Sequence, residues 1–119
     1  VFTAGQLPFV DGKMAVTGKV GAEVTAEVAN GLARTAVLNA LAAVESQVGS
    51  LDRVTRIVKL VVFVASDPSF AGQPGVANGA SDTLVEIFGD IGKHARSAVG
   101  VAVLPLDAAV ELELVVEFK

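Results

Sequence analysis

The sequence contains no cysteine, no tyrosine and no tryptophan, and it has a single histidine. Without cysteine, the chain has no disulfides, no thiol catalysis and no cysteine-ligated zinc site. A lone histidine cannot form a metal site by itself, and the sequence around His94 favours a loop position. Aromatic residues make up 5% of the chain and all are phenylalanine, which leaves no stacking platform of the kind used by RNA-binding domains.

Basic residues are few and scattered. The chain has 9 Lys and Arg residues against 13 Asp and Glu residues, which gives a formal net charge of −4. Proteins that bind nucleic acid gather Lys and Arg against the phosphate backbone. We therefore expect no nucleic-acid partner.

Long hydrophobic runs are also missing. No stretch approaches the ~18 consecutive apolar residues of a membrane-spanning helix, so we expect no membrane association. No signal peptide is visible, and a cytoplasmic location is the default expectation. The chain opens at Val1 without a methionine, in what resembles the middle of a strand, so we expect an N-terminal segment to be missing.

The chain is rich in hydrophobic residues. Its 119 residues suffice for one domain, residues 1–119, and 52% of them are hydrophobic while only 18% are charged. The mean hydropathy of +0.62 is high for a small soluble monomer. Part of this surplus is expected at a subunit interface.

The periodicity predicts two helices and five strands. Residues 23–48 form an Ala- and Leu-rich helix with a buried stripe and a stop at Gly49. A shorter helix is predicted from a cap at Ser81 to Phe88. The predicted strands are residues 1–6, 14–17 (after a turn at Asp11–Gly12), 54–65, 98–104 and 110–118.

This order predicts an α/β (α+β) fold, a mixed sheet with both helices packed on one face. Residues 60–64 are apolar at every position, a pattern typical of a strand that is covered on both faces. Because two helices cover only one face, another subunit is the simplest cover for the second.

Few residues are candidates for chemistry. Arg96 begins an otherwise apolar strand, where the pattern alone favours a structural salt bridge over a fork for a substrate carboxylate. Glu111 lies on the predicted face away from the helices, as does Glu113. Each is either a solvated glutamate or, at an interface, a candidate acid or base. Asn78 is interpreted as a turn residue, with a ligand-directed amide as the alternative.

Several segments together resemble the YjgF/RidA family. Residues 5–8 (GQLP) resemble the family's SGQ-P segment, and residues 50–54 with 58–63 resemble its SLDDVVKVTVF strand entry. Residues 94–99 (HARSAV) resemble PARSAV, and residues 104–105 with 110–113 resemble the closing LP…VEIE. Their order and spacing match along almost the whole chain.

The resemblance implies a chorismate-mutase-like fold and a homotrimer, with a central barrel and ligand clefts between subunits. Archetypal members hydrolyse reactive enamines and imines such as 2-aminoacrylate to 2-keto acids and ammonia, with no metal or organic cofactor. By position, Arg96 matches the arginine that grips the substrate carboxylate, and Glu111 the glutamate that holds the attacking water. Gly5 and Asn78 match cleft-lining positions, and Ala98 stands where many members have cysteine.

Three functions follow for comparison. The first is an enamine/imine deaminase that acts on a small carboxylate substrate. The second is a non-catalytic trimer that binds small carboxylate metabolites. The third, a translation inhibitor or endoribonuclease, is disfavoured by the negative charge and the missing aromatic platform.

Overall fold

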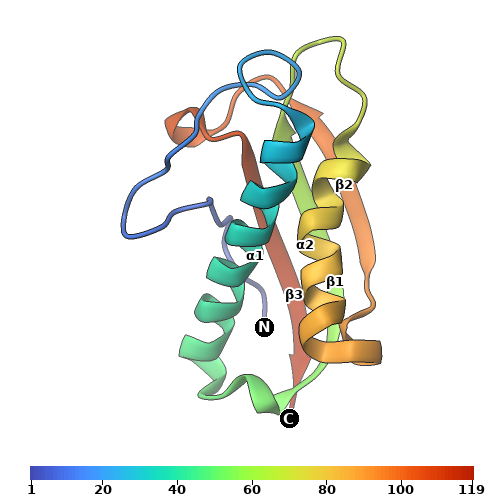
Figure 1. The fold of residues 1–119 in the computed structure, drawn as a ribbon. Coiled ribbons are helices and arrows are strands. Elements are labelled where there is room, and N and C mark those ends of the chain that lie inside the picture. The colour runs from blue at the N-terminus through green and yellow to red at the C-terminus, as the bar shows by residue number, and fades with distance from the viewer.

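A computed structural model describes all residues, 1–119. The chain has two α-helices and three strands in the order α-β-α-β-β, with short 3₁₀ turns between some of them (Figure 1). The elements are α1 (Ala26–Val48), β1 (Val54–Ala65), α2 (Gln73–Phe88), β2 (Ala95–Val101) and β3 (Val110–Phe118). No helix has both the length and the hydrophobicity to cross a bilayer.

The three strands form one mixed sheet in the order β2-β1-β3. β1 is parallel to β2, with Leu60 opposite Arg96, and antiparallel to β3, with Phe63 opposite Glu111. Residues opposite one another in a sheet point to the same face, and faces alternate along a strand. Arg96 therefore lies on the face of Leu60, and Glu111 on the other face.

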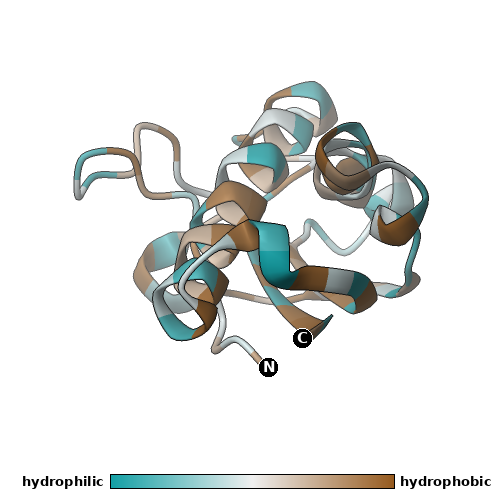
Figure 2. Cartoon of the chain, turned by 90° about the horizontal axis from the view of Figure 1, so that it is seen from below, coloured by the Kyte–Doolittle hydropathy of each residue, from teal (hydrophilic) through white to brown (hydrophobic).

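Both helices pack side by side on one face of the sheet, as predicted (Figure 1). Their buried residues and the alternate residues Leu60, Val62 and Val64 of β1 form the main hydrophobic core. Figure 2 shows hydrophilic and hydrophobic stretches mixed along both helices, as expected when only one side of each helix is buried.

The opposite face of the sheet is only partly covered. Ala65, Leu104 and Ala108 form a small second cluster there, against which Leu7 and Phe63 also pack. Beyond this cluster Val61 stays half-buried, and the side chain of Val99 is 44% exposed. The chain itself therefore covers one end of this face and leaves an apolar area next to Glu111 and Glu113.

The N-terminal segment is irregular. Residues 1–6 run antiparallel to β3, with bridges from Phe2 to Val115 and from Gln6 to Leu112, so the predicted pairing exists without a regular strand. At the predicted hairpin turn, Asp11 and Gly12 both have positive φ (51° and 76°). The returning strand predicted over residues 14–17 is wrong, because pairing stops at the Val10–Lys13 bridge.

The second helix begins much earlier than predicted. It starts at Gln73 instead of Ser81, with Gly72 as its N-cap residue and a proline in its first turn. Gly79 belongs in this helix because it touches α1: a Cβ atom there would lie 2.0 Å from the Asn30 carbonyl oxygen. Close helix packing thus outweighs the low helix propensity of glycine. Asn78 is accordingly a helical residue, and its interpretation as a turn residue is wrong.

The remaining boundaries are close to those predicted. β1 and β3 have the predicted bounds, α1 begins three residues late behind a Thr25 cap, and Gly49 ends it with a φ of 92°. β2 begins at Ala95 instead of Ala98 and ends before Leu104, which turns into the second cluster.

Candidate functional site

Arg96 lies near the start of β2, and its guanidinium contacts two neutral side chains of α2. Nη1 donates to Oδ1 of Asn78 at 2.7 Å and to Oγ of Ser81 at 3.2 Å. Asn78 and Ser81 are three positions apart on the helix, so both point to the same side. The early start of α2 is what places Asn78 beside the arginine.

These two contacts leave most of the guanidinium free. A guanidinium has five N–H groups, and Nη1 contributes two of them, both donated within this chain. The N–H groups of Nε and Nη2 have no hydrogen-bond partner in the chain. That edge is the fork that binds a carboxylate with two parallel hydrogen bonds.

Arg96 has no acidic partner. The ion pairs of the chain are Arg34–Glu86 and Lys93–Asp90, each at 3.1 Å. The prediction that Arg96 forms a structural salt bridge is therefore wrong. The positive charge is solvated or available to an anion, because Asn78 and Ser81 orient the guanidinium without neutralising it.

His94 is a loop residue, as predicted, and its ring is held at both nitrogens. Nδ1 lies 2.6 Å from the carbonyl oxygen of Gly92, and Nε2 lies 2.9 Å from Oγ of Ser81. Ser81 was missed as a site residue because the sequence placed it at a helix start. A pocket of about 250 Å³ lies beside Arg96, and its lining residues are Ser81, Val85, Lys93, His94 and Arg96. A larger pocket of about 310 Å³ lies at the ends of β1 and β2.

The second group of predicted residues lies on the other face of the sheet. Glu111 of β3 is half-buried there, and Gly5 of the N-terminal segment packs directly on its carboxylate. A Cβ atom on Gly5 would lie 2.0 Å from Oε1 of Glu111, so a larger residue at this position would displace the carboxylate. The pairing of Gln6 with Leu112 fixes the segment in this register.

Within one chain, the structure thus forms two half-sites and does not join them. Arg96, Asn78 and Ala98 lie on the helix side, where Ala98 packs partly against the core. Gly5 and Glu111 lie on the opposite face, on the far side of β1. No hydrogen bond or ion pair connects the two groups.

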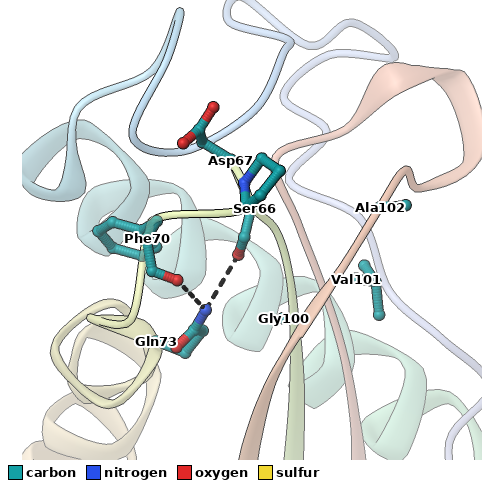
Figure 3. Close-up of a pocket in the computed structure, with 8 residues that line it drawn as sticks. Ser66, Asp67, Phe70, Gln73, Gly100, Val101 and Ala102 are labelled. Carbon is teal, nitrogen blue, oxygen red and sulfur yellow. Dashed lines mark hydrogen bonds between the residues drawn. The ribbon is translucent and has the colours of Figure 1, made fainter.

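The larger pocket contains none of the predicted residues. It lies where β1 and β2 end and α2 begins, and Figure 3 shows Gln73 among its lining residues, with the side-chain amide directed toward Phe70 and Ser66. Nε2 of Gln73 donates to the Phe70 carbonyl at 2.8 Å and to Ser66 Oγ at 3.2 Å (Figure 3). These bonds tie the end of β1 to the start of α2, so a structural role accounts for the polar groups.

Asp67 lines this larger pocket and is hydrogen-bonded to Ser69. The hydroxyl and the backbone N–H of Ser69 both donate hydrogen bonds to the Asp67 carboxylate. Together they hold the pKa of Asp67 below its ordinary value, and the hydroxyl contributes most. The carboxylate points away from Gln73 in Figure 3. No cluster of three or more His, Cys, Asp and Glu side chains is placed to hold a metal ion.

The elements described above define an α+β domain of the chorismate-mutase-like class. A family model described as "YjgF/chorismate mutase-like, putative endoribonuclease" matches residues 1–118. The chain belongs to this family, YjgF/RidA.

Its relatives cover the whole domain. Protein TCP17 of Trypanosoma cruzi is 49% identical over 117 residues, which span 98% of this chain and 73% of that protein. The crystal structure of Atu1372 from Agrobacterium tumefaciens, of unknown function, superposes with a TM-score of 0.97 at 44% identity, covering 99% of this chain and 75% of that one. A Shewanella oneidensis MR-1 structure that shares the endoribonuclease description has a TM-score of 0.95 at 34% identity, covering 98% and 78%.

Proposed function

We propose that this protein hydrolyses reactive enamine and imine intermediates, of the 2-aminoacrylate type, to 2-keto acids and ammonia. The observation that supports this most directly is the state of Arg96. Its Nη1 is fixed by Asn78 and Ser81, its Nε and Nη2 edge is unpaired, and no carboxylate of the chain neutralises it. Such an edge suits the carboxylate of an imino acid, which two parallel hydrogen bonds would hold in one orientation.

The second requirement is a placed water molecule. In this proposal Glu111 holds the water, and its position against the Gly5 backbone restricts where the carboxylate can lie. Because Arg96 and Glu111 lie on opposite faces of the sheet, the two half-sites of one chain cannot act on one small substrate. The proposal therefore requires a neighbouring chain, and a homotrimer with clefts between subunits would supply it.

The exposed sheet face supports such an assembly. Val61 and Val99 are left partly uncovered beside Glu111 and Glu113, an apolar area with carboxylates at its side. Packing this face against another chain would bury the apolar area and enclose the glutamates. If this face packs against the β2 edge of the next chain, Glu111 would approach the Arg96 half-site of that chain.

The chemistry needs no cofactor in this scheme. The oxygen of water bonds to the iminium carbon while Glu111 accepts one proton from the water. The nitrogen of the resulting carbinolamine takes that proton from Glu111, and the C–N bond breaks to release ammonia. The hydroxyl loses its proton to the ammonia as it becomes the keto oxygen, so that iminium and water yield keto acid and ammonium. The iminium carbon is already electrophilic, so the enzyme mainly orients the reactants and moves protons.

The separation of the half-sites also favours a second candidate, a protein that binds small carboxylate metabolites without turnover. The same Arg96 edge would hold the ligand, and no productive water would be needed. The endoribonuclease activity suggested by the family description fits poorly, because the net charge is −4 and all aromatic residues are phenylalanine.

The decisive experiment measures keto acid formation from imino acids generated in the assay by an amino-acid oxidase, with semicarbazide as the competing trap. We expect the wild type to exceed spontaneous hydrolysis and Arg96→Ala to fall to background. Arg56→Ala is the matched control, because Arg56 is exposed on β1 and its side chain makes no hydrogen bond or ion pair. If the wild type stays at background for several side chains while calorimetry detects binding of pyruvate, the binding protein replaces the deaminase.

A further inference from the structure

A serine and a histidine lie in contact beside the arginine. Oγ of Ser81 is 2.9 Å from Nε2 of His94, and Nδ1 of the same ring is 2.6 Å from the carbonyl oxygen of Gly92. The serine comes from α2 and the histidine from the loop before β2, so two elements of the fold hold the pair together. The PARSAV pattern has proline at the position of His94, so the family resemblance gives the histidine no role.

The backbone fixes the tautomer of the neutral ring. A carbonyl oxygen can only accept a hydrogen bond, so Nδ1 carries the proton that is donated to Gly92. Nε2 of the neutral imidazole is then an acceptor, and the contact with Ser81 is a hydrogen bond donated by the serine hydroxyl. This is the arrangement of a nucleophile, a base and a group that orients the base.

The guanidinium of Arg96 also contacts the hydroxyl. Nη1 of Arg96 donates to Oγ of Ser81 at 3.2 Å, which favours the developing alkoxide. Lys93 lines the same pocket of about 250 Å³, although its ammonium is paired with the exposed Asp90. An oxyanion formed beside Ser81 would depend on Arg96 for stabilisation, because the backbone N–H groups in the middle of α2 are used within the helix.

We propose that Ser81 is an activated nucleophile with His94 as its general base, and that this pocket hydrolyses short acyl esters that carry a carboxylate. The free edge of Arg96 would hold the carboxylate, and the acyl carbon would lie at Oγ of Ser81. The activity shares Arg96 with the proposed deaminase but does not depend on it, since Glu111 and a second chain take no part.

The reaction has two steps. Oγ of Ser81 bonds to the acyl carbon while its proton passes to Nε2 of His94; the C–O bond to the alcohol then breaks, and the alcohol leaves with that proton. In the second step water adds to the acyl carbon and gives a proton to Nε2. The C–Oγ bond breaks, the proton returns to Oγ, and the carboxylic acid leaves.

The test uses the full-length wild type and two probes. A fluorophosphonate reagent, which reacts with activated serines, should label Ser81, and peptide mass mapping should locate the label. The wild type should also release nitrophenolate from 4-nitrophenyl hydrogen succinate faster than buffer does, and faster than from the uncharged 4-nitrophenyl acetate. Ser81→Ala and His94→Gln should each lower the succinate rate roughly 100-fold or more.

Ser97→Ala is the matched control, because Ser97 follows Arg96 but lies on the other face of β2, opposite Val61. It should keep the wild-type rate and labelling. A wild type that shows neither labelling nor ester hydrolysis above buffer overturns the proposal, as does a label mapped to another serine. The wild-type labelling decides the question even if a Ser81 variant fails to fold, and the imine assay is scored separately on different substrates.

Discussion

The backbone of Gly5 lies directly against the carboxylate of Glu111, so that a Cβ atom at residue 5 would be 2.0 Å from Oε1. The contact joins an irregular N-terminal segment to the middle of β3. The atom in the way is the end of a flexible side chain, so a methyl group at residue 5 would move the carboxylate instead of the backbone. Gly5 thus determines where Glu111 can lie.

Replacing Gly5 with alanine should therefore impair function more than stability. We expect Gly5→Ala to lower the rate of imine hydrolysis by roughly tenfold or more, because a misplaced group at a reacting centre is costly. The midpoint of thermal unfolding should shift little. Assays of both quantities on the same preparation check this, and a variant that keeps the full rate would show that the position of the Glu111 carboxylate does not matter.

Asn78 orients the guanidinium, and its removal tests that role. Asn78 is exposed, so Asn78→Ala should change the free energy of unfolding by less than about 0.5 kcal/mol. It removes the 2.7 Å bond to Nη1, and we expect pyruvate to bind roughly three- to tenfold more weakly by calorimetry.

The variant Asn78→Asp sharpens this test. It keeps the shape of the side chain and gives Arg96 an acidic partner, which competes with any ligand carboxylate. Binding should weaken more than in Asn78→Ala, and the loss should shrink at high salt, where charges are screened. Equal affinity in both variants would contradict an anionic ligand at Arg96.

The strands β1 and β3 and the first helix could be predicted from the sequence because local pattern and burial agree there. Residues 54–65 and 110–118 are β-branched or alternating, and α1 has a continuous buried stripe, so β1 and β3 have the expected bounds. The start of α2 could not be predicted in this way. Its glycines indicate an irregular segment, and the contact between Gly79 and Asn30 of α1, which a single chain pattern does not reveal, explains why Gly79 is helical.

The candidate site also has a part that the sequence predicts and a part that depends on tertiary contacts. The sequence pattern marks Arg96, Glu111 and Asn78 as candidates and the resemblance gives them roles; the structure brings Asn78 to Arg96 and Gly5 to Glu111. The contacts of Ser81 could not be predicted from the sequence, because its place in the helix depends on where α2 begins. Whether the two half-sites meet is likewise not decided within a single chain; in the proposed function a neighbouring chain joins them.

The pH dependence of stability should include a contribution from Asp67. Hydrogen bonds from Ser69 lower the pKa of Asp67 in the folded state, so the stabilisation is present above the ordinary aspartate value of about 3.9 and is lost as the pH falls through the lower folded value. Ser69→Ala removes the largest cause, and the pKa of Asp67 should rise toward the ordinary value in an NMR titration. The two proteins should differ most in stability near neutral pH and converge in acid. A pKa of Asp67 that is the same in both proteins would contradict this account.

Two helical glycines make opposite predictions for the same substitution. At Gly31 of α1 a Cβ atom would meet nothing within 4 Å, whereas at Gly79 of α2 it would lie 2.0 Å from the backbone oxygen of Asn30. Gly31→Ala should raise the free energy of unfolding by about 0.5–1 kcal/mol, because alanine restricts the unfolded chain and favours the helix. Gly79→Ala should lower it by about 1–3 kcal/mol, because the two helices must separate. Urea unfolding of both variants measures the difference, and a stabilised Gly79→Ala would mean that α1 and α2 do not approach as closely as the structure shows.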